Sequence, residues 1–247
     1  MRADDRATAR FERDRKSGAA ELARRAATLI HRAVRRGVPA KDLQRLRRRV
    51  ARAHPTMAAV WNAAHADDPL AFVTQSRTGA SSAARAARRL LSRRRIVTVS
   101  YSSSVLDALS GSPRAIYVAE SLPGGEGTRM AAALRRRGIP ARVIPDAAMA
   151  AWVARAGAVV FGADAVTARG IVNKIGSRLL ALAARAEGIP CYVVTDTSKF
   201  AVPPTRFPSP RLSPDGRFEW VELELITRVI TERGLLTPRF VEVLLKT

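Results

Sequence analysis

The sequence has little cysteine, few aromatic residues and no long apolar run, and each shortage excludes a class of protein. Its single cysteine, Cys191, excludes an intramolecular disulfide framework and a cysteine-rich zinc site. No stretch approaches the roughly 18–20 uncharged apolar residues that cross a bilayer. The longest apolar stretch, near residues 147–166, is interrupted by Arg155, and the N-terminus lacks the apolar segment of a secretory signal. We therefore expect a soluble, cytoplasmic protein without a membrane partner.

Acidic residues are also scarce, since 43 Lys and Arg face 21 Asp and Glu and give a formal charge of +22. Residues 1–95 carry 24 basic and 8 acidic residues, a net charge of +16, and residues 96–247 carry 19 and 13, a net charge of +6. Two interpretations stay open. The excess of Arg, together with the many Ala residues, reflects a codon bias towards G and C, or residues 1–95 bind RNA or another acidic partner. Aromatic residues, 5% of the chain, are not interleaved with the arginines, so a base-stacking platform is not supported.

The first third of the chain has the apolar spacing of helices, and we predict a helical N-terminal domain over residues 1–94. Apolar residues recur every three or four positions between Leu22 and Val34, and again between Leu43 and Val50. Thr56 is expected to cap a third helix. A fourth is expected from about Pro69 to Leu91.

After Arg95 short apolar runs alternate with helical segments, which is typical of buried parallel strands joined by helical crossovers. The predicted strands are 96–100, 115–119, 141–144, 158–161 and 191–194. Crossover helices are expected over residues 127–137 and 173–187. The fold class is therefore α/β, with a Rossmann-like parallel-sheet domain over residues 95–247.

Ligands of such sheets bind beyond the carboxyl ends of the strands. The candidates there are Ser100, Glu120, Asp146, Gly162 to Asp164 and Thr195-Asp196. Asp164 directly follows a predicted strand, and Asn173 and Lys174 are expected to begin a helix whose N-terminus favours an anion. A carboxylate facing a phosphate subsite is typical of sugar-phosphate enzymes. An aspartate that merely caps the next helix is the alternative.

Several motifs occur in one order along this half of the chain. They are Glu120-Ser-Leu-Pro123 with Gly127, Gly138-Ile-Pro with Asp146, the run from Gly162 to Ala181, Gly188-Ile-Pro-Cys-Tyr-Val193, Ser198-Lys-Phe200 and 230–238. They resemble the family that unites the alpha, beta and delta subunits of translation initiation factor 2B with methylthioribose-1-phosphate isomerase and ribose-1,5-bisphosphate isomerase. His54-Pro-Thr56 resembles an element of that family's helical N-terminal domain.

The resemblance implies a metal-free, cofactor-free site in which a cysteine and an aspartate transfer protons in the isomerases. Asp164 matches the aspartate, whereas Ser100 stands in place of the cysteine, and a hydroxyl is a much poorer acid and base than a thiol. Leu122 replaces an arginine that faces the substrate phosphate, and Arg129 is a candidate substitute. The chain thus resembles the initiation-factor members more than the active isomerases.

The expected function is binding of a phosphorylated sugar or nucleotide, in a regulatory role or with degenerate isomerase activity. The alternative is an active aldose–ketose isomerase that uses Asp164 and Ser100. We also expect a homodimer or larger homo-oligomer, as in the family. The expected ligand-binding residues are Tyr101, Ser102, Glu120, Gly127, Gly162, Asn173, Lys174 and Lys199.

Overall fold

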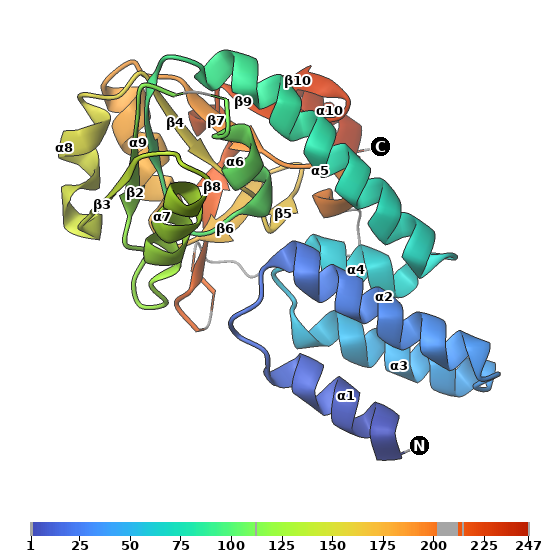
Figure 1. Cartoon of the computed structure of the whole chain (residues 1–247). Coiled ribbons are helices and arrows are strands. Elements are labelled where there is room, and N and C mark those ends of the chain that lie inside the picture. Colours follow the sequence, from blue (N-terminus) through green and yellow to red (C-terminus); the bar gives the residue numbers. More distant parts are fainter. Residues whose placement is uncertain (1, 112, 202–211, 214, 247) are drawn as a thin grey trace.

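The computed structural model describes residues 2–111, 113–201, 212–213 and 215–246 and shows a group of helices beside a layered α/β unit (Figure 1). The helices are α1 (Arg2–Arg13), α2 (Ala19–Arg35), α3 (Ala40–Ala53), α4 (Ala58–His65) and α5 (Pro69–Leu91). None of the helices in these residues is long and apolar enough to cross a membrane.

The first four helices bury the apolar stripes that their spacing predicted. Phe11, Leu22, Ile30, Val50 and Val60 form their common core. Helix α5 begins with Pro69 and is capped by the Asp68 carboxylate, which accepts hydrogen bonds from the next two free N–H groups at 3.0 Å. The expected cap by Thr56 is wrong. Helix α4 begins one residue later than a Thr56 cap allows, after Met57, and has no side-chain cap.

The α/β unit is built on a seven-stranded sheet with the strand order β10-β9-β7-β4-β1-β2-β3. Its strands are β1 (Arg95–Thr98), β2 (Ala115–Ala119), β3 (Ala141–Ile144), β4 (Ala158–Phe161), β7 (Cys191–Val194), β9 (Arg228–Thr231) and β10 (Gly234–Leu236). All neighbouring pairs are parallel except β9 with β10. The five predicted strands are confirmed, and the Rossmann-like α/β class with them.

Alternate residues of the central strands face two separate cores. On one face Ile96, Val160 and Val194 pack under α5, α6 (Ser103–Ala108) and α7 (Glu126–Arg136). On the other face Val97 and Val159 pack under α8 (Met149–Val153), α9 (Ser177–Ala186) and α10 (Pro238–Lys246). Helices on both faces bury the central strands β4 and β7 at every position, which explains the continuous apolar runs in the sequence.

Helix α5 connects the two parts of the molecule (Figure 1). Its first half contacts α2 and α4, whereas Ala83, Ala87 and Leu91 of its second half belong to the core of the sheet. The domain boundary between residues 94 and 95 stays a prediction, because α5 precedes this boundary in sequence but packs against both the helical part and the sheet.

A second, three-stranded antiparallel sheet was not predicted. It contains β5 (Ala165–Val166), β6 (Gly170–Lys174) and β8 (Phe218–Glu222). Asn173 and Lys174 therefore lie on a strand, and the prediction that they begin a helix is wrong, since α9 starts at Ser177 after Gly176. The partner strand β8 is distant in sequence, so local spacing carried no sign of the pairing. Short 3₁₀ turns span Asp146–Ala148, Thr197–Lys199 and Leu223–Leu225.

Candidate functional site

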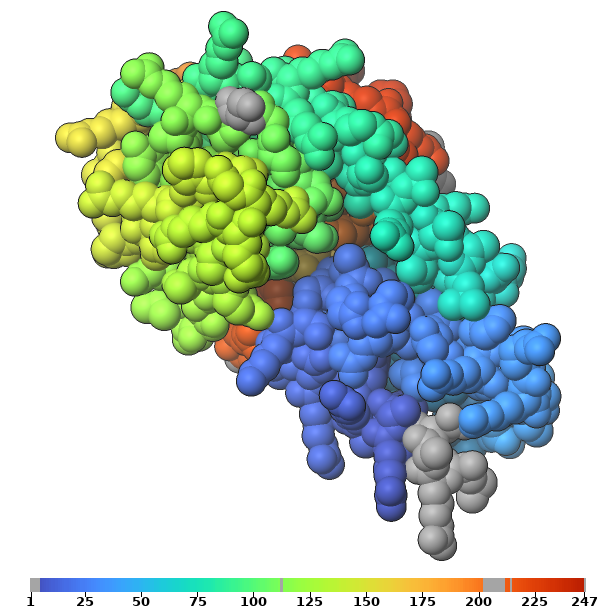
Figure 2. Space-filling model, in the orientation of Figure 1, coloured from blue at the N-terminus to red at the C-terminus, as the bar shows by residue number. Residues whose placement is uncertain are grey.

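A cavity of about 560 Å³ lies at the carboxyl ends of β1 and β4, where the helical part meets the α/β unit. Figure 2 shows the blue N-terminal helices and the green part of the α/β unit meeting along a furrow. The cavity wall combines strand ends, strand β6, the start of α7 and the loop between α1 and α2. Its volume lies within the range of about 300–1,000 Å³ that is typical of small-molecule sites.

Of the ten residues predicted to be catalytic or ligand-binding, eight line this one cavity: Ser100, Tyr101, Ser102, Gly162, Asp164, Asn173, Lys174 and Lys199. Glu120 and Gly127 are not among the residues that line it. Their backbones instead tie α7 to the sheet, because the Gly127 N–H donates to Glu120 O at 3.1 Å. A Cβ atom at Gly127 would lie 1.6 Å from Ala119 O, so this glycine permits a close backbone approach.

A set of strand-end hydrogen bonds fixes the position of Ser100. Ser100 has a φ of +66°, which is uncommon for a residue with a side chain, and its N–H donates to Ser121 Oγ at 2.7 Å. The carboxylate of Asp146 accepts from the N–H groups of Ser121 and Leu122, both at 2.8 Å. Asp146 thus fixes the loop at Ser121 and Leu122, and Ser121 in turn holds the backbone of Ser100. Such backbone conformations cluster at functional sites.

Asp164 connects β4 to both the small sheet and the helical part. Its N–H donates to Val172 O at 2.8 Å, and its carbonyl accepts from the N–H of Ala58 at 3.0 Å. Desolvation of the carboxyl group in the cavity raises its pKa to about 6, against the attraction of Lys199 and Lys174. A carboxyl group with this pKa exchanges protons readily near neutral pH.

Lys174 is held by a carboxylate that sequence reasoning missed. Glu126 Oε2 lies 2.8 Å from Lys174 Nζ, and Glu126 Oε1 lies 3.1 Å from Arg217 Nη2. The side chains of Lys174 and Glu126 are only 4% and 12% exposed. Burial alone raises the pKa of Glu126, but Lys174 and Arg217 outweigh it and lower the pKa overall. The only sequence signal for Glu126 is its place beside Gly127, and nothing local indicated Arg217.

Two other predicted residues make structural hydrogen bonds in the cavity wall. Asn173 Nδ2 donates to Ser177 Oγ at 2.7 Å, and this hydroxyl donates in turn to Lys174 O, so β6 is tied to the start of α9. Ser102 Oγ accepts from the N–H of Val105 at 3.4 Å and caps α6. Asn173 and Ser102, which were predicted to bind a ligand, therefore stabilise the elements that form the cavity wall.

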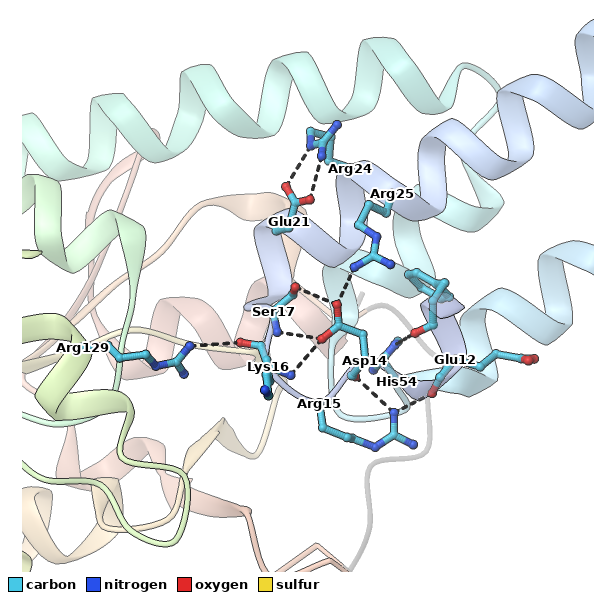
Figure 3. Close-up of polar contacts among 11 residues, drawn as sticks. Glu12, Asp14, Arg15, Lys16, Ser17, Glu21, Arg24, Arg25, His54 and Arg129 are labelled. Carbon is cyan, nitrogen blue, oxygen red and sulfur yellow. Dashed lines mark hydrogen bonds and ion pairs between the residues drawn. The ribbon is translucent and has the colours of Figure 1, made fainter. Parts of the chain in front are cut away.

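The loop between α1 and α2 forms the rim of the cavity on the helical side (Figure 3). The Asp14 carboxylate accepts from the N–H groups of Lys16 and Ser17 at 2.8 and 2.9 Å, and it also pairs with Arg25. Although burial opposes the shift, these hydrogen bonds lower the pKa of Asp14. Arg129 Nη1 donates to Lys16 O at 3.5 Å and so links α7 to the rim. The candidate substitute Arg129 thus lies at the site.

His54 and Cys191 occupy structural positions. His54 lines the cavity, and its Nε2–H donates to Phe11 O at 3.0 Å, which helps to anchor α1, while burial lowers the pKa of its ring. Cys191 is buried at the start of β7, where desolvation raises the pKa of its thiol. Among the described residues, no group of three or more His, Cys, Asp or Glu side chains is placed to hold a metal ion.

Comparison with curated proteins identifies two kinds of relative. A putative translation initiation factor eIF-2B subunit 2-like protein of Pyrococcus horikoshii is 39% identical over 111 residues, 42% of this chain and 40% of the relative. Methylthioribose-1-phosphate isomerase 1 of Pseudothermotoga lettingae is 33% identical over 160 residues, 54% of this chain and 46% of the relative. The matched region thus spans less than half of each relative.

Solved structures match nearly the whole fold. The Pyrococcus horikoshii translation initiation factor eIF-2B superposes with a TM-score of 0.86 and 26% identity, covering 96% of this chain and 98% of that one. The 5-methylthioribose 1-phosphate isomerase of the same organism gives 0.72 and 18%, covering 98% and 86%, which shows the fold alone. The model of the initiation factor 2 subunit family matches residues 70–207, more than half of the sequence, and the chain therefore belongs to this family.

Proposed function

We propose that this chain is a regulatory, ligand-binding member of the family whose cavity takes a phosphorylated sugar or nucleotide. The observation that carries the proposal is the combination of Asp164, Lys174 and Lys199 in one cavity with a serine at the end of β1. The two buried ammonium groups favour an anionic ligand, and carboxylate and hydroxyl groups beside them suit sugar hydroxyls.

The serine is the reason for proposing binding rather than turnover. Ser100 borders the cavity, but its hydroxyl is a far weaker acid than the thiol at this position in the isomerases that the sequence resembles. The chain's own thiol, Cys191, is not among the cavity's lining residues. These two observations support ligand binding without efficient proton transfer.

A thermal-shift screen tests the binding proposal. Ribose 1,5-bisphosphate, methylthioribose 1-phosphate, AMP and inorganic phosphate are compared with unphosphorylated ribose. We expect at least one phosphorylated sugar or nucleotide to raise the melting temperature, and ribose to leave it unchanged. Lys199→Gln should weaken the shift, whereas Lys246→Gln, which changes an exposed lysine on α10, should preserve it. The proposal is rejected if no phosphorylated compound stabilises the protein.

The second candidate is an active aldose–ketose isomerase, and the raised pKa of Asp164 favours it. In such a reaction the ring oxygen takes up a proton as the ring opens, and a base removes the proton from C2. An acid then returns a proton at C1 while the C2 hydroxyl gives up its proton to form the ketone, so no proton is gained or lost overall. Ketose formation from ribose 1,5-bisphosphate or methylthioribose 1-phosphate is followed by NMR. Turnover that Asp164→Asn abolishes would support this candidate. Turnover that appears only in Ser100→Cys would show that the serine is what prevents it.

We further propose that the chain forms a homodimer or larger homo-oligomer through α10. Val241 and Leu245 of this helix are buried against the sheet, while Phe240 and Val243 on its other side are 53% and 56% exposed. A related fold occurs in the tetrameric eIF2B-beta2-delta2 complex from C. thermophilum, which has a TM-score of 0.77 at 18% identity. Sedimentation of wild type and of Phe240→Ser/Val243→Ser should show dissociation in the variant, with Val34→Ser on α2 as the control. A wild type that sediments as a monomer contradicts the proposal.

A further inference from the structure

Two rows of cations lie on the outward side of α1 and α3, which pack side by side (Figure 1). The rows consist of Arg6, Arg10 and Arg13 on α1, and of Lys41, Arg45, Arg48 and Arg52 on α3. All seven residues are exposed and recur every three or four positions, so each row runs along one face of its helix. The buried Phe11 and Val50 lie on the opposite faces.

Few carboxylates neutralise these rows. Arg45 pairs with the exposed Asp42 at 3.3 Å, which is a surface pair of little energetic value. In the described part of the chain no carboxylate forms an ion pair with the other six cations. Arg24 and Arg25 of α2 differ, since they are bound to Glu21 and Asp14 (Figure 3). Arg32 and Arg35 at the far end of α2 are exposed like the two rows, so what distinguishes the face of α1 and α3 is seven exposed cations in two adjacent rows.

Shallow hollows border both rows. The hollow along the α3 row is lined by Glu12, Arg15, Lys41, Gln44, Arg45, Arg48, Arg49, Arg52 and Ala53. The hollow along the α1 row is lined by Arg6, Ala9, Arg10, Arg13 and the residues 14–17. Arg15 borders both, so the two hollows join into one basic surface. Neither contains an aromatic residue or an aliphatic residue larger than alanine.

This composition decides between kinds of acidic partner. A stable protein interface needs an apolar centre, which the surface lacks. A single nucleic-acid strand is normally held by aromatic side chains that stack on its bases, and these are lacking too. Guanidinium groups match phosphate oxygens in geometry as well as in charge. Among nucleic acids the partner that fits is a double helix, which shows its phosphates outwards and keeps its bases inside.

We propose that the surface formed by the two cation rows of α1 and α3 binds the backbone of double-helical RNA without reading its sequence. Two packed helices are too broad to enter the grooves of B-form DNA, whose major groove of about 12 Å admits a single helix. They can lie across the wide, shallow minor groove of A-form RNA. Arg15 and Arg52 border both this surface and the small-molecule cavity, whereas Arg10, Arg45 and Arg48 do not line the cavity and so test the surface separately.

The size of the surface sets the expected salt dependence. The α3 row extends over 11 residue steps, or about 16 Å at 1.5 Å per residue. Double-stranded DNA carries one charge per about 1.7 Å of its axis, and this charge density serves as a lower guide for the more compact RNA duplex. About nine phosphates then lie along this length, and roughly half face the protein. Four or five contacts predict that log K falls with log salt concentration with a slope of about −4.

The experiment measures binding of the full chain to a fluorescent RNA duplex by anisotropy over a salt series. The test variant is Arg10→Gln/Arg45→Gln/Arg48→Gln. The matched control is Arg136→Gln/Arg155→Gln/Arg185→Gln, which removes the same charge from exposed positions of the α/β unit. We expect the test variant to lose about tenfold or more in affinity and to have a shallower salt slope, with the control close to wild type. Circular dichroism checks that both variants are folded.

Four outcomes would overturn the proposal. One is the absence of duplex binding by the wild type, and another is an equal loss in the test and control variants. If poly-glutamate displaces the duplex as well as unlabelled RNA does at equal charge, the partner is an acidic protein. If a DNA duplex or single-stranded RNA binds as tightly as the RNA duplex, the A-form preference is wrong.

Discussion

The buried ion pair between Glu126 and Lys174 gives the sharpest test of the site's electrostatics. Glu126→Gln removes the carboxylate that lies 2.8 Å from Lys174 Nζ and leaves an ammonium group with 4% side-chain exposure without this counter-charge. Breaking one side of such a pair costs about 3–5 kcal/mol, because the remaining charge stays desolvated. Arg217 is less affected, since its side chain is 23% exposed and reaches water.

The double variant Glu126→Gln/Lys174→Met separates the cost of an unpaired charge from the net value of the pair. Replacing both partners of a buried pair is often close to neutral, so we expect the double variant to be more stable than Glu126→Gln alone. Urea denaturation followed by circular dichroism gives the free energies of unfolding. The reasoning is refuted if Glu126→Gln costs less than about 1 kcal/mol, or if the double variant is no more stable than the single one.

Inorganic phosphate provides a second readout on a truncated variant. In Glu126→Ala the side chain ends at Cβ, so space opens for a phosphate ion to take the place of the carboxylate between Lys174 and Arg217. Added phosphate should then restore stability, by about 2.7 kcal/mol at one hundred times its dissociation constant. Wild type should gain less, because its own carboxylate competes for the two cations. Equal stabilisation of both proteins would contradict this account.

Three further predictions concern the cavity and its supports. Burial raises the pKa of Asp164 in the folded state to about 6, against an ordinary 3.8, so the folded state binds more protons than the unfolded state between these pH values. The free energy of unfolding therefore falls by about 3 kcal/mol as the pH rises from about 4 to about 6. Asp164→Asn should lose this pH-dependent part of the free energy of unfolding, measured by urea titrations at pH 4 to 7. Wild type and variant whose free energies change with pH in parallel would contradict the prediction. Asp146→Ala should lower the free energy of unfolding by about 1–3 kcal/mol and speed amide exchange at residues 121–122, whose N–H groups lose their acceptor. Unchanged exchange would contradict the role of Asp146 in holding this loop. Gly127→Ala should lower the melting temperature by the equivalent of about 3 kcal/mol, because its Cβ meets Ala119 O, whereas the exposed Gly138→Ala should cost less; equal costs would contradict the close approach.

The elements that the sequence predicted well are those whose signal is local. The run Ala158–Phe161 is apolar at every position and is a strand buried on both faces. The stripe from Leu22 to Val34 predicts α2, in which Leu22 and Ile30 are buried while Val34 is 49% exposed. Eight of the ten predicted site residues also lie in one cavity, because strand ends of a parallel sheet meet at one edge.

The residues that the sequence assigned to the wrong element are positioned by strand pairing between segments far apart in the sequence. Gly170–Lys174 pairs with Phe218–Glu222, and neither segment shows from its own residues that the other is its partner. This pairing, and not a helix terminus, sets the direction in which Lys174 enters the cavity. Glu126 and Arg217 likewise became part of the site only when α7 and β8 came together.

The sequence by itself determined the α/β class, the helical beginning and the edge of the sheet at which the cavity lies, because hydrophobic period and strand ends are local properties. Tertiary structure alone decided the charges that Asp164 and Lys174 experience. Desolvation and counter-charges depend on which groups the fold brings within a few ångströms. The same holds for the overall charge of +22, which the fold distributes unevenly by pairing some arginines and leaving two rows on α1 and α3 exposed.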